Sequence, residues 1–282
     1  MLTPFFVGLG VAAILYFTTG WWGFLLIFPW IAGWISVGLI ISSKLQGKKK
    51  DLGRRIAILM AAPIFLAFLG IVQHENLQLE ETIFYFAAGV FSRVLIHYSV
   101  AKVFGPLIWG RGFCGWACWT AAVMDWLPIK ENKSIPKKLT WIRVPVFMAS
   151  IATPLAFIFS GYDYFSLHVK ESLGKWHQFI WFLIGNGVYY IAAVSLAFAL
   201  KKKRAFCKIA CPVSLVMKPS SIRPLVKRKP TGEKCTECGA CNRQCPMDVD
   251  IMSFIRQGKA ILNTECILCG LCKHVCPAGA ID

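Results

Sequence analysis

Twelve cysteines give this 282-residue chain its clearest capacity for chemistry, and ten of them lie after residue 200. Eight of the ten form two similar runs that begin at Cys235 and Cys266, each with the spacing C-x2-C-x2-C-x3-C followed by proline. Thiolates are soft ligands that suit iron–sulfur clusters, zinc and copper(I). The sequence therefore predicts thiolate-bound metal in the C-terminal part of the chain.

The spacing within the two runs favours [4Fe-4S] clusters. Three thiolates separated by two residues hold one cluster in this pattern, and the fourth cysteine of the run ligates the other cluster. Zinc sites instead use C-x2–4-C pairs, and disulfides are disfavoured in a domain expected to face a reducing cytosol. We predict two crossed ligand sets, with Cys235, Cys238, Cys241 and Cys276 for cluster one and Cys266, Cys269, Cys272 and Cys245 for cluster two.

A second pattern, R-x-F-C-x3-C, occurs twice, from Arg111 to Cys118 and from Arg204 to Cys211. Cysteines four residues apart share one face of a helix or turn, so two such pairs brought together supply four thiolates. A third [4Fe-4S] cluster, copper or zinc all suit thiolates, and local disulfides or metal-free buried thiols also remain open. The two arginines would offset part of the negative charge of a cluster. We call the four candidate ligands the membrane quartet: Cys114, Cys118, Cys207 and Cys211.

The elements that must position these cysteines are hydrophobic helices. The chain is 56% apolar with a mean hydropathy of +0.57, whereas soluble domains are about 45–50% apolar. A membrane span needs about 20 apolar residues. We predict six spans, of which the first two form a hairpin turning at 18–20: Leu2–Thr19, Phe24–Ile41, Ile56–Val72, Thr82–Phe104, Val144–Ser160 and Phe179–Leu200.

Lysine and arginine are distributed unevenly among the predicted loops. Residues 42–55 and 109–143 hold six each and residues 201–230 hold ten, whereas 73–81 hold none and 161–176 hold two. The positive-inside rule places the rich loops in the cytoplasm. We therefore predict a cytoplasmic (inner) membrane protein with its C-terminal domain facing the cytoplasm, and the net charge of +17 requires no nucleic-acid partner.

The repeated R-x-F-C-x3-C motif follows a predicted helical hairpin each time, which indicates a duplicated unit with pseudo-twofold packing. The predicted fold is an α-helical membrane bundle of about six spans with two repeated hairpin units, followed by a small C-terminal α+β ferredoxin domain with two clusters. The predicted boundaries are 1–45 for an N-terminal membrane hairpin, 46–218 for a four-helix membrane core with both C-x3-C motifs, and 219–282 for the cytoplasmic domain.

Charged residues within or beside the fourth span are candidates for function, because charge is costly at membrane depth. Arg93 and His97 lie four residues apart and would bind a quinone headgroup and carry its protons, while a snorkelling arginine and an ordinary buried histidine remain open. A haem is disfavoured because His97 has no second histidine at matching depth. On the outer side, Glu75, Glu80 and Glu81 are predicted to form a solvated face in preference to the alternative, a proton exit.

The cysteine runs, together with R-x-F-C-G-W-x-C at 111–118 and F-C-x3-C-P at 206–212, resemble the NapH-type membrane polyferredoxins over roughly residues 50–282. That group includes quinol dehydrogenase subunits and is related to the membrane halves of nitrous-oxide-reductase regulators and to copper-oxidase assembly ferredoxins. The resemblance implies electron exchange between the membrane quinone pool and partner redox proteins. One departure is that the family's first motif usually ends C-P, whereas Trp119 follows Cys118 here.

The predicted function is that of an electron-transfer subunit in a multi-subunit complex of the quinol dehydrogenase or quinone reductase type. A quinol gives two electrons and each cluster takes one, so several centres are expected between the quinone pool and a partner redox subunit, soluble ferredoxin or reductase. The alternative is an assembly or maturation factor that delivers reductant to a metalloenzyme, with copper in the membrane quartet. A third possibility is that the membrane part serves only as an anchor.

Overall fold

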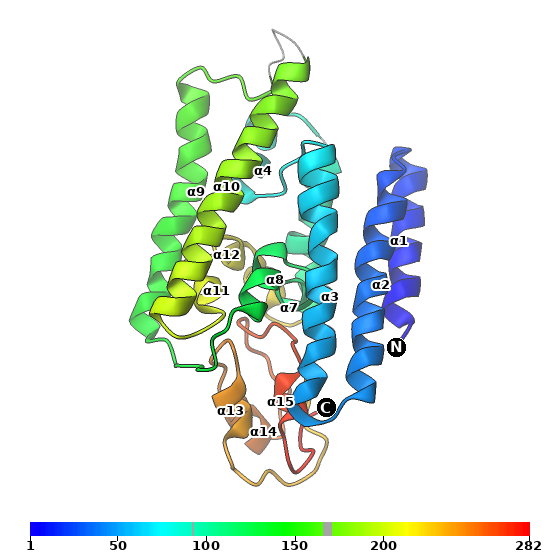
Figure 1. The fold of residues 1–282 in the computed structure, drawn as a ribbon, viewed down its shortest axis with the longest axis vertical. Helices are drawn as coiled ribbons and strands as arrows, with labels where there is room; N and C mark the ends of the chain where they lie inside the picture. Colours follow the sequence, from blue (N-terminus) through cyan, green and yellow to red (C-terminus); the bar gives the residue numbers. More distant parts are fainter. Residues whose placement is uncertain (92, 166–170) are drawn as a thin grey trace.

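Apolar segments in lipid must satisfy their backbone hydrogen bonds internally, which favours helices, and the chain is mostly helical (Figure 1). The computed structural model describes residues 1–91, 93–165 and 171–282, without the side chains of residue 93 and of residues 171–174. The long helices run side by side, and the C-terminal domain of loops and short helices lies beyond one end of them, at the bottom of Figure 1.

The N-terminus forms a hairpin of α1 (Thr3–Thr19) and α2 (Gly23–Lys44). Gly20 closes α1 with a φ of +73°, the left-handed conformation typical of a helix end. α2 packs on the following helix through Gly38 and Gly53, where a Cβ at Gly53 would lie 2.2 Å from the carbonyl oxygen of Gly38. Such small residues allow membrane helices to approach closely.

Four helices among the described residues are long and apolar enough to cross a membrane, which is compatible with a multi-pass membrane protein. α1, with 17 residues, is shorter. The prediction of six spans is therefore not confirmed. The four are α2, then η1 (Gly47–Lys50) continued by α3 (Asp51–Pro63) and η2 (Ile64–Val72), then η4 (Lys137–Ile142) continued by α9 (Arg143–Phe159), and α10 (Glu171–Ala199).

The predicted fourth span, Thr82–Phe104, is broken in the structure. α4 (Leu79–Ala87) ends shortly before Gly89, whose φ of +65° closes the helix. Hydropathy did not reveal this break because apolar residues continue through it. The helical path resumes as α5 (Arg93–Tyr98), η3 (Ser99–Phe104) and α6 (Gly105–Trp109).

The segment between η2 and α4 turns back into the bundle. A Cβ at Gly185, near the middle of α10, would lie 1.9 Å from Gln78 Oε1. The carbonyl oxygen of Leu77 accepts a hydrogen bond from Lys102 Nζ at 2.8 Å. Irregular backbone is tolerated at membrane depth where protein surrounds it, so residues 73–81 are not the simple outer loop that their polarity predicted.

Short helices carry the cysteine motifs at the end of the bundle nearest the C-terminal domain (Figure 1). They are α7 (Gly112–Trp116), α8 (Trp119–Trp126), α11 (Ala205–Ile209), α12 (Val213–Met217) and η5 (Pro219–Ser221).

The C-terminal domain contains α13 (Ala240–Gln244), α14 (Ile251–Arg256) and α15 (Leu271–His274). Its predicted α+β character is not confirmed, because the described residues form no strand and only one isolated antiparallel bridge, between Pro230 and Ile281. The C-terminal domain packs directly against the helix bundle. One continuous hydrophobic core includes residues of α3 and α8 as well as residues of the C-terminal domain, among them Ile58, Trp119, Met247 and Ile267.

Candidate iron–sulfur sites

The C-terminal domain contains two cavities, and each is lined by four cysteines. One is lined by the four cysteines predicted for cluster two, and the other by the four predicted for cluster one. Both cavities therefore draw three thiols from one run and the fourth from the other run. Their cysteines are Cys245, Cys266, Cys269 and Cys272 in the first, and Cys235, Cys238, Cys241 and Cys276 in the second.

The two runs fold into the same backbone shape. In each run, a residue with left-handed backbone conformation precedes the second cysteine and a left-handed glycine follows it. These are Glu237 (φ +54°) and Gly239 (+67°) around Cys238, and Leu268 (+53°) and Gly270 (+76°) around Cys269. Left-handed conformations are costly for residues other than glycine, and they turn the chain sharply. This repeated turn brings three thiols of each run to one cavity.

The membrane quartet is gathered in the same hydrophobic core. Cys114 on α7 and Cys207 on α11 are 8% and 5% exposed, and Cys118 and Cys211 pack beside them. Cys211 interacts electrostatically with the other three thiols. The sulfur of Met217 lies 3.6 Å from that of Cys114. The duplicated motif thus brings both cysteine pairs to one site, as the pseudo-twofold interpretation expects.

The two motif arginines have different roles. Arg204 donates from Nη1 to the carbonyl oxygen of Cys114 at 2.9 Å and pairs with Asp125 at 2.5 Å. Arg54 also pairs with Asp125, at 2.7 Å, so a buried ionic cluster holds the α7–α8 segment against α3. Arg111 is fully buried; its Nη1 lies 2.6 Å from Glu265, but its Nε and Nη2 have no hydrogen-bond partner among the described residues.

The unpaired nitrogens of Arg111 bear on what the quartet could hold. Arg111 interacts electrostatically with Cys114, Cys207 and Cys211. Buried N–H donors without partners are costly, and a thiolate-ligated cluster offers sulfur atoms and negative charge to such donors. Among the described residues, no group of three or more histidine, cysteine or acidic side chains is close enough to hold a single metal ion.

The membrane quartet lies directly against the ligand loop of cluster two. A Cβ at Gly115 would lie 2.1 Å from the carbonyl oxygen of Ile267. The indole Nε1 of Trp116 donates to the carbonyl oxygen of Leu268 at 3.1 Å. By contrast, Cys238 of cluster one is exposed. The three thiol sets therefore run from the bundle outward, with the quartet first, cluster two next and cluster one at the solvent-facing end.

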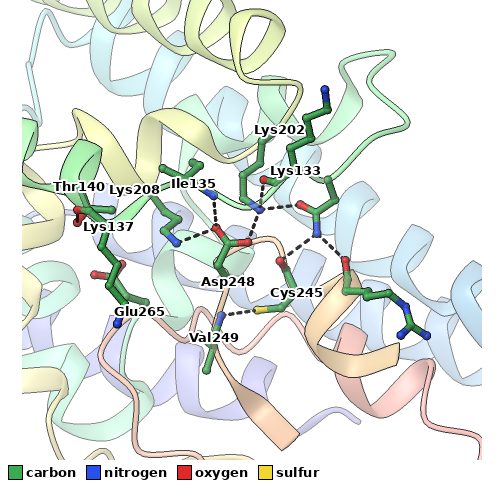
Figure 2. Close-up of polar contacts among 12 residues, drawn as sticks. Lys133, Ile135, Lys137, Thr140, Lys202, Lys208, Cys245, Asp248, Val249 and Glu265 are labelled. Carbon is green, nitrogen blue, oxygen red and sulfur yellow. Dashed lines mark hydrogen bonds and ion pairs between the residues drawn. The ribbon is translucent and has the colours of Figure 1, made fainter. Parts of the chain in front are cut away.

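An acidic residue after the first cysteine run fastens that run to the bundle (Figure 2). Asp248 lies 2.7 Å from Lys202 Nζ and 2.8 Å from Lys208 Nζ, and it accepts a hydrogen bond from the backbone N–H of Ile135 at 3.2 Å. Burial would raise the pKa of Asp248, but the two lysines lower it below its usual value. The carboxylate is thus ionised at neutral pH.

Glu265 fastens the second run in the same way. It pairs with Arg111 at 2.6 Å, Arg143 at 2.8 Å and Lys218 at 3.0 Å. Burial opposes ionisation, but Arg111, Arg143 and Lys218 lower the pKa of Glu265 to about 2. Because Glu265 directly precedes the ligand Cys266, this ionic contact fixes the position of the cluster-two loop against the bundle.

The structure separates His97 from the membrane quartet. The ring of His97 stacks on Phe28, with centroids 5.7 Å apart and planes 3° apart, and also packs near Phe24 and Trp21. These partners belong to α2 and the turn before it, so His97 faces the N-terminal hairpin. The side chain of Arg93 lies outside the described part of the chain. The prediction that these two residues handle a quinone is therefore untested.

Sequence reasoning missed the place of Lys102. It is 4% exposed, its Nζ lies 4.5 Å from the ring centroid of Tyr98 and 5.0 Å from that of Trp119, and it interacts electrostatically with Cys118 and Cys211. The signal in the sequence was a lysine within an apolar run.

The prediction of a solvated acidic face is wrong, because Glu81 is only 1% exposed.

Comparisons with known families agree with this distribution of sites. A family model described as a 4Fe-4S dicluster domain matches residues 234–281, which include all eight C-terminal cysteines. A second, described as a 4Fe-4S binding domain, matches residues 99–136 and 187–230, which include the membrane quartet. The fold and the sites thus define an iron–sulfur electron-transfer protein with ferredoxin-type 4Fe-4S domains.

Several proteins are similar to the chain. The uncharacterized protein MJ0750 of Methanocaldococcus jannaschii is 29% identical over 66% of this chain and 77% of its own length. The putative electron transport protein YccM of Escherichia coli is 22% identical over 64% of this chain, and the methylamine utilization ferredoxin-type protein MauN of Methylorubrum extorquens is 29% identical over 54%. The match spans 53% of YccM and of MauN, about half of each. No solved structure matches.

Proposed function

We propose that this protein passes electrons one at a time between a lipid-soluble quinone and a partner redox protein, as a membrane subunit of the NapH type. The observation that carries the proposal is the contact between the quartet segment and the cluster-two loop at Gly115 and Ile267. Each [4Fe-4S] cluster, when bound, accepts and donates a single electron. The chain supplies the positions and the charges around them.

The arrangement of ligands gives the proposed order of transfer. The membrane quartet lies at the bundle, beside the lipid in which a quinone dissolves, and Arg111, with two unpaired buried nitrogens, interacts electrostatically with three of its thiols. Cys266 and Cys269 then lie across the Gly115 contact, and Cys238 is at the exposed end. We place the partner at cluster one because Cys238 is exposed there. We place the C-terminal domain in the cytoplasm because of the lysine- and arginine-rich loops.

The quinone side of the proposal involves the N-terminal hairpin. His97 is enclosed by aromatic rings from α2, and aromatic rings with a polar group at their edge suit a flat, partly polar headgroup. His97→Ala should slow reduction of the clusters by a quinol analogue while reduction by dithionite stays unchanged. His177→Ala, which changes a histidine that contacts Asp163 and Tyr162 instead of the N-terminal hairpin, is the matched control. Equal loss of quinol reactivity in both variants would remove His97 from the proposal.

The proposal is tested by electron paramagnetic resonance with iron analysis on anaerobic protein, before and after a quinol analogue is added. Quinol should reduce the clusters, and Cys114→Ser or Cys207→Ser should remove one signal and the quinol response while two ferredoxin-type signals remain reducible by dithionite. Met217→Leu, which changes the neighbour of Cys114 but no ligand, is the control. Unchanged signals in the cysteine variants would contradict the relay, and copper at the quartet would favour the maturation-factor alternative.

A further inference from the structure

Polar side chains line the interior of the bundle between the membrane quartet and the end opposite the C-terminal domain. Glu81 is 1% exposed, Glu75 5%, Gln78 2% and Asn76 0%. Ionisable and polar groups are rare inside membrane bundles because burying them is costly, and they commonly mark proton or ion pathways. The re-entrant segment before α4 brings these residues to the level of Gly185, near the middle of α10.

Glu80 connects this polar group to the membrane quartet. Tyr189 donates its hydroxyl to Glu80 Oε1 at 3.0 Å. Lys102 interacts electrostatically with Glu80 on one side and with Cys118, Cys211 and Cys114 on the other. Lys102 is thus a buried cation that interacts with a carboxylate and with three of the four candidate metal ligands.

A second observation points to the same place. The hydroxyl of Tyr98 is buried, has no hydrogen-bond partner among the described residues, and interacts electrostatically with Glu80 and Cys211. The side-chain nitrogen of Gln78 is also buried without such a partner. Buried donors without partners are uncommon, and the ring of Tyr98 lies 4.5 Å from Lys102 Nζ.

Glu81 extends the path away from the quartet. It interacts electrostatically with Tyr164 and Glu75, and Tyr164 in turn interacts with Tyr85 and Tyr162. Tyr162 and Tyr164 belong to the segment after α9, at the end of the bundle opposite the C-terminal domain (Figure 1). The titratable and charged groups that face the two carboxylates are therefore Lys102, Tyr98, Tyr189, Tyr164 and Glu75.

We propose that Glu80 and Glu81 form a proton-accepting site inside the membrane bundle, coupled through Lys102 to the charge at the membrane quartet. The site takes up one proton for each electron that reaches the quartet and releases it toward the end of the bundle opposite the C-terminal domain. This inference rests on the proposed function, because it assumes a redox group held by the quartet.

Charge balance gives the physical reason. An added electron at the quartet is a negative charge near Glu80 in a poorly screened interior, and a nearby negative charge favours the protonated form of a carboxyl group. When a quinol is oxidised, it loses two electrons and two protons and becomes the quinone. Each electron would pass to a cluster held by the quartet, one proton would be accepted at Glu80 with it, and the proton affinity of Glu80 would fall again once the electron had left for cluster two.

The test is a redox titration of the membrane-quartet signal in the intact protein at several pH values, without quinol. We expect the midpoint potential to fall as pH rises, with a limit of about 59 mV for each tenfold change in proton concentration when one proton accompanies one electron. Glu80→Gln should abolish this dependence, and Glu81→Gln should weaken it. Glu131→Gln, an exposed carboxylate paired with Lys201 and Lys133, should leave it unchanged.

Two further measurements separate the possible outcomes. Redox-difference infrared spectra should show a carboxyl C=O band that Glu80→Gln removes, and Tyr189→Phe, which keeps the carboxylate, should shift that band. A pH-independent midpoint in the wild-type protein overturns the proton-accepting site and leaves the electron relay intact. Absence of any quartet signal overturns both proposals, whereas pH dependence that survives Glu80→Gln overturns only the assignment to Glu80.

Discussion

Among single residues, the two motif arginines decide how the negative charge of a cluster at the membrane quartet would be compensated. Arg204 is committed to Asp125 and to the carbonyl oxygen of Cys114, so its role is chiefly structural. Arg111 keeps two buried N–H groups unpaired beside the thiols. It therefore contributes both charge and donors to whatever the quartet holds, and donors and positive charge near a cluster stabilise its more reduced, more negative form.

Arg111→Gln should lower the midpoint potential of the membrane centre. The expected change is about 2–4 kcal/mol, the size of a Coulomb interaction over about 4–8 Å at an effective dielectric constant of about 20. Redox titration followed by electron paramagnetic resonance measures it. Arg111→Lys, which keeps the charge, should retain most of the potential, and Arg223→Gln, an exposed arginine, should not change it. A wild-type midpoint in Arg111→Gln would show that Arg111 does not act on the centre.

At the scale of elements, the decisive contact is the one between α7 and the loop that holds Cys266 and Cys269. Gly115 has no side chain, and this lets the backbone of Ile267 approach it closely. The neighbouring hydrogen bond from Trp116 to Leu268 fixes the same contact. Electron transfer between two centres depends on a short, fixed separation, so this junction is where the relay is most easily interrupted.

Gly115→Ala should slow electron transfer from the membrane quartet to cluster two without removing either set of ligands. The added Cβ would lie 2.1 Å from a backbone oxygen that cannot rotate away, so the two segments must separate, and overpacking of this kind costs about 1–3 kcal/mol. Rapid freeze-quench spectroscopy after quinol mixing measures the rate. Gly187→Ala, where no atom lies within 4 Å of the new Cβ, is the matched control; equal rates in both variants would contradict this junction's role.

The sequence was sufficient to predict the crossed sets of cysteines and the gathering of the membrane quartet, because fixed motif spacing and an internal repeat constrain both. It was not sufficient for the path of residues 73–104. Glu75 and Glu81 look like loop residues, and only the packing of Gln78 against Gly185 on a distant helix brings their segment inside. Hydropathy also does not reveal the break at Gly89, because a left-handed helix end depends on local backbone geometry and not on apolar character.

At the scale of the whole molecule, the bundle and the C-terminal domain behave as one packed unit. A single hydrophobic core runs through both, and each cysteine run is fastened to the bundle by one acid, Asp248 or Glu265, paired with basic residues. The pKa of each acid is lowered by its partners, so both ion pairs persist at neutral pH. The shared core and these ion pairs keep the three thiol sets in a fixed order.

Asp248→Asn should loosen the first cysteine run from the bundle. Lys202 is fully buried and Lys208 nearly so, and removing one partner of a buried ion pair costs on the order of 3 kcal/mol. Hydrogen exchange in residues 240–256 should become faster. Glu131→Gln, which breaks only exposed ion pairs, should show no change, and an Asp248→Asn protein with wild-type exchange would contradict the fastening role.

Variants of the two ferredoxin sets test the order of the centres. Cys269→Ser, which disturbs cluster two, should leave the membrane centre reducible by quinol and prevent electrons from reaching cluster one. Cys235→Ser should leave the membrane centre and cluster two reducible but abolish transfer to an external acceptor. Selective spectroscopic monitoring of each cluster measures this. Quinol-driven reduction of cluster one in Cys269→Ser would show that the order is wrong.

We propose three clusters held by twelve thiolates, and metal analysis of protein purified without oxygen tests this proposal most directly. We predict about twelve iron atoms and matching acid-labile sulfide per chain, four for each [4Fe-4S] cluster, with neither copper nor zinc in stoichiometric amount. About eight iron atoms together with one copper or zinc ion would contradict the third cluster, and iron-free protein would contradict the whole account.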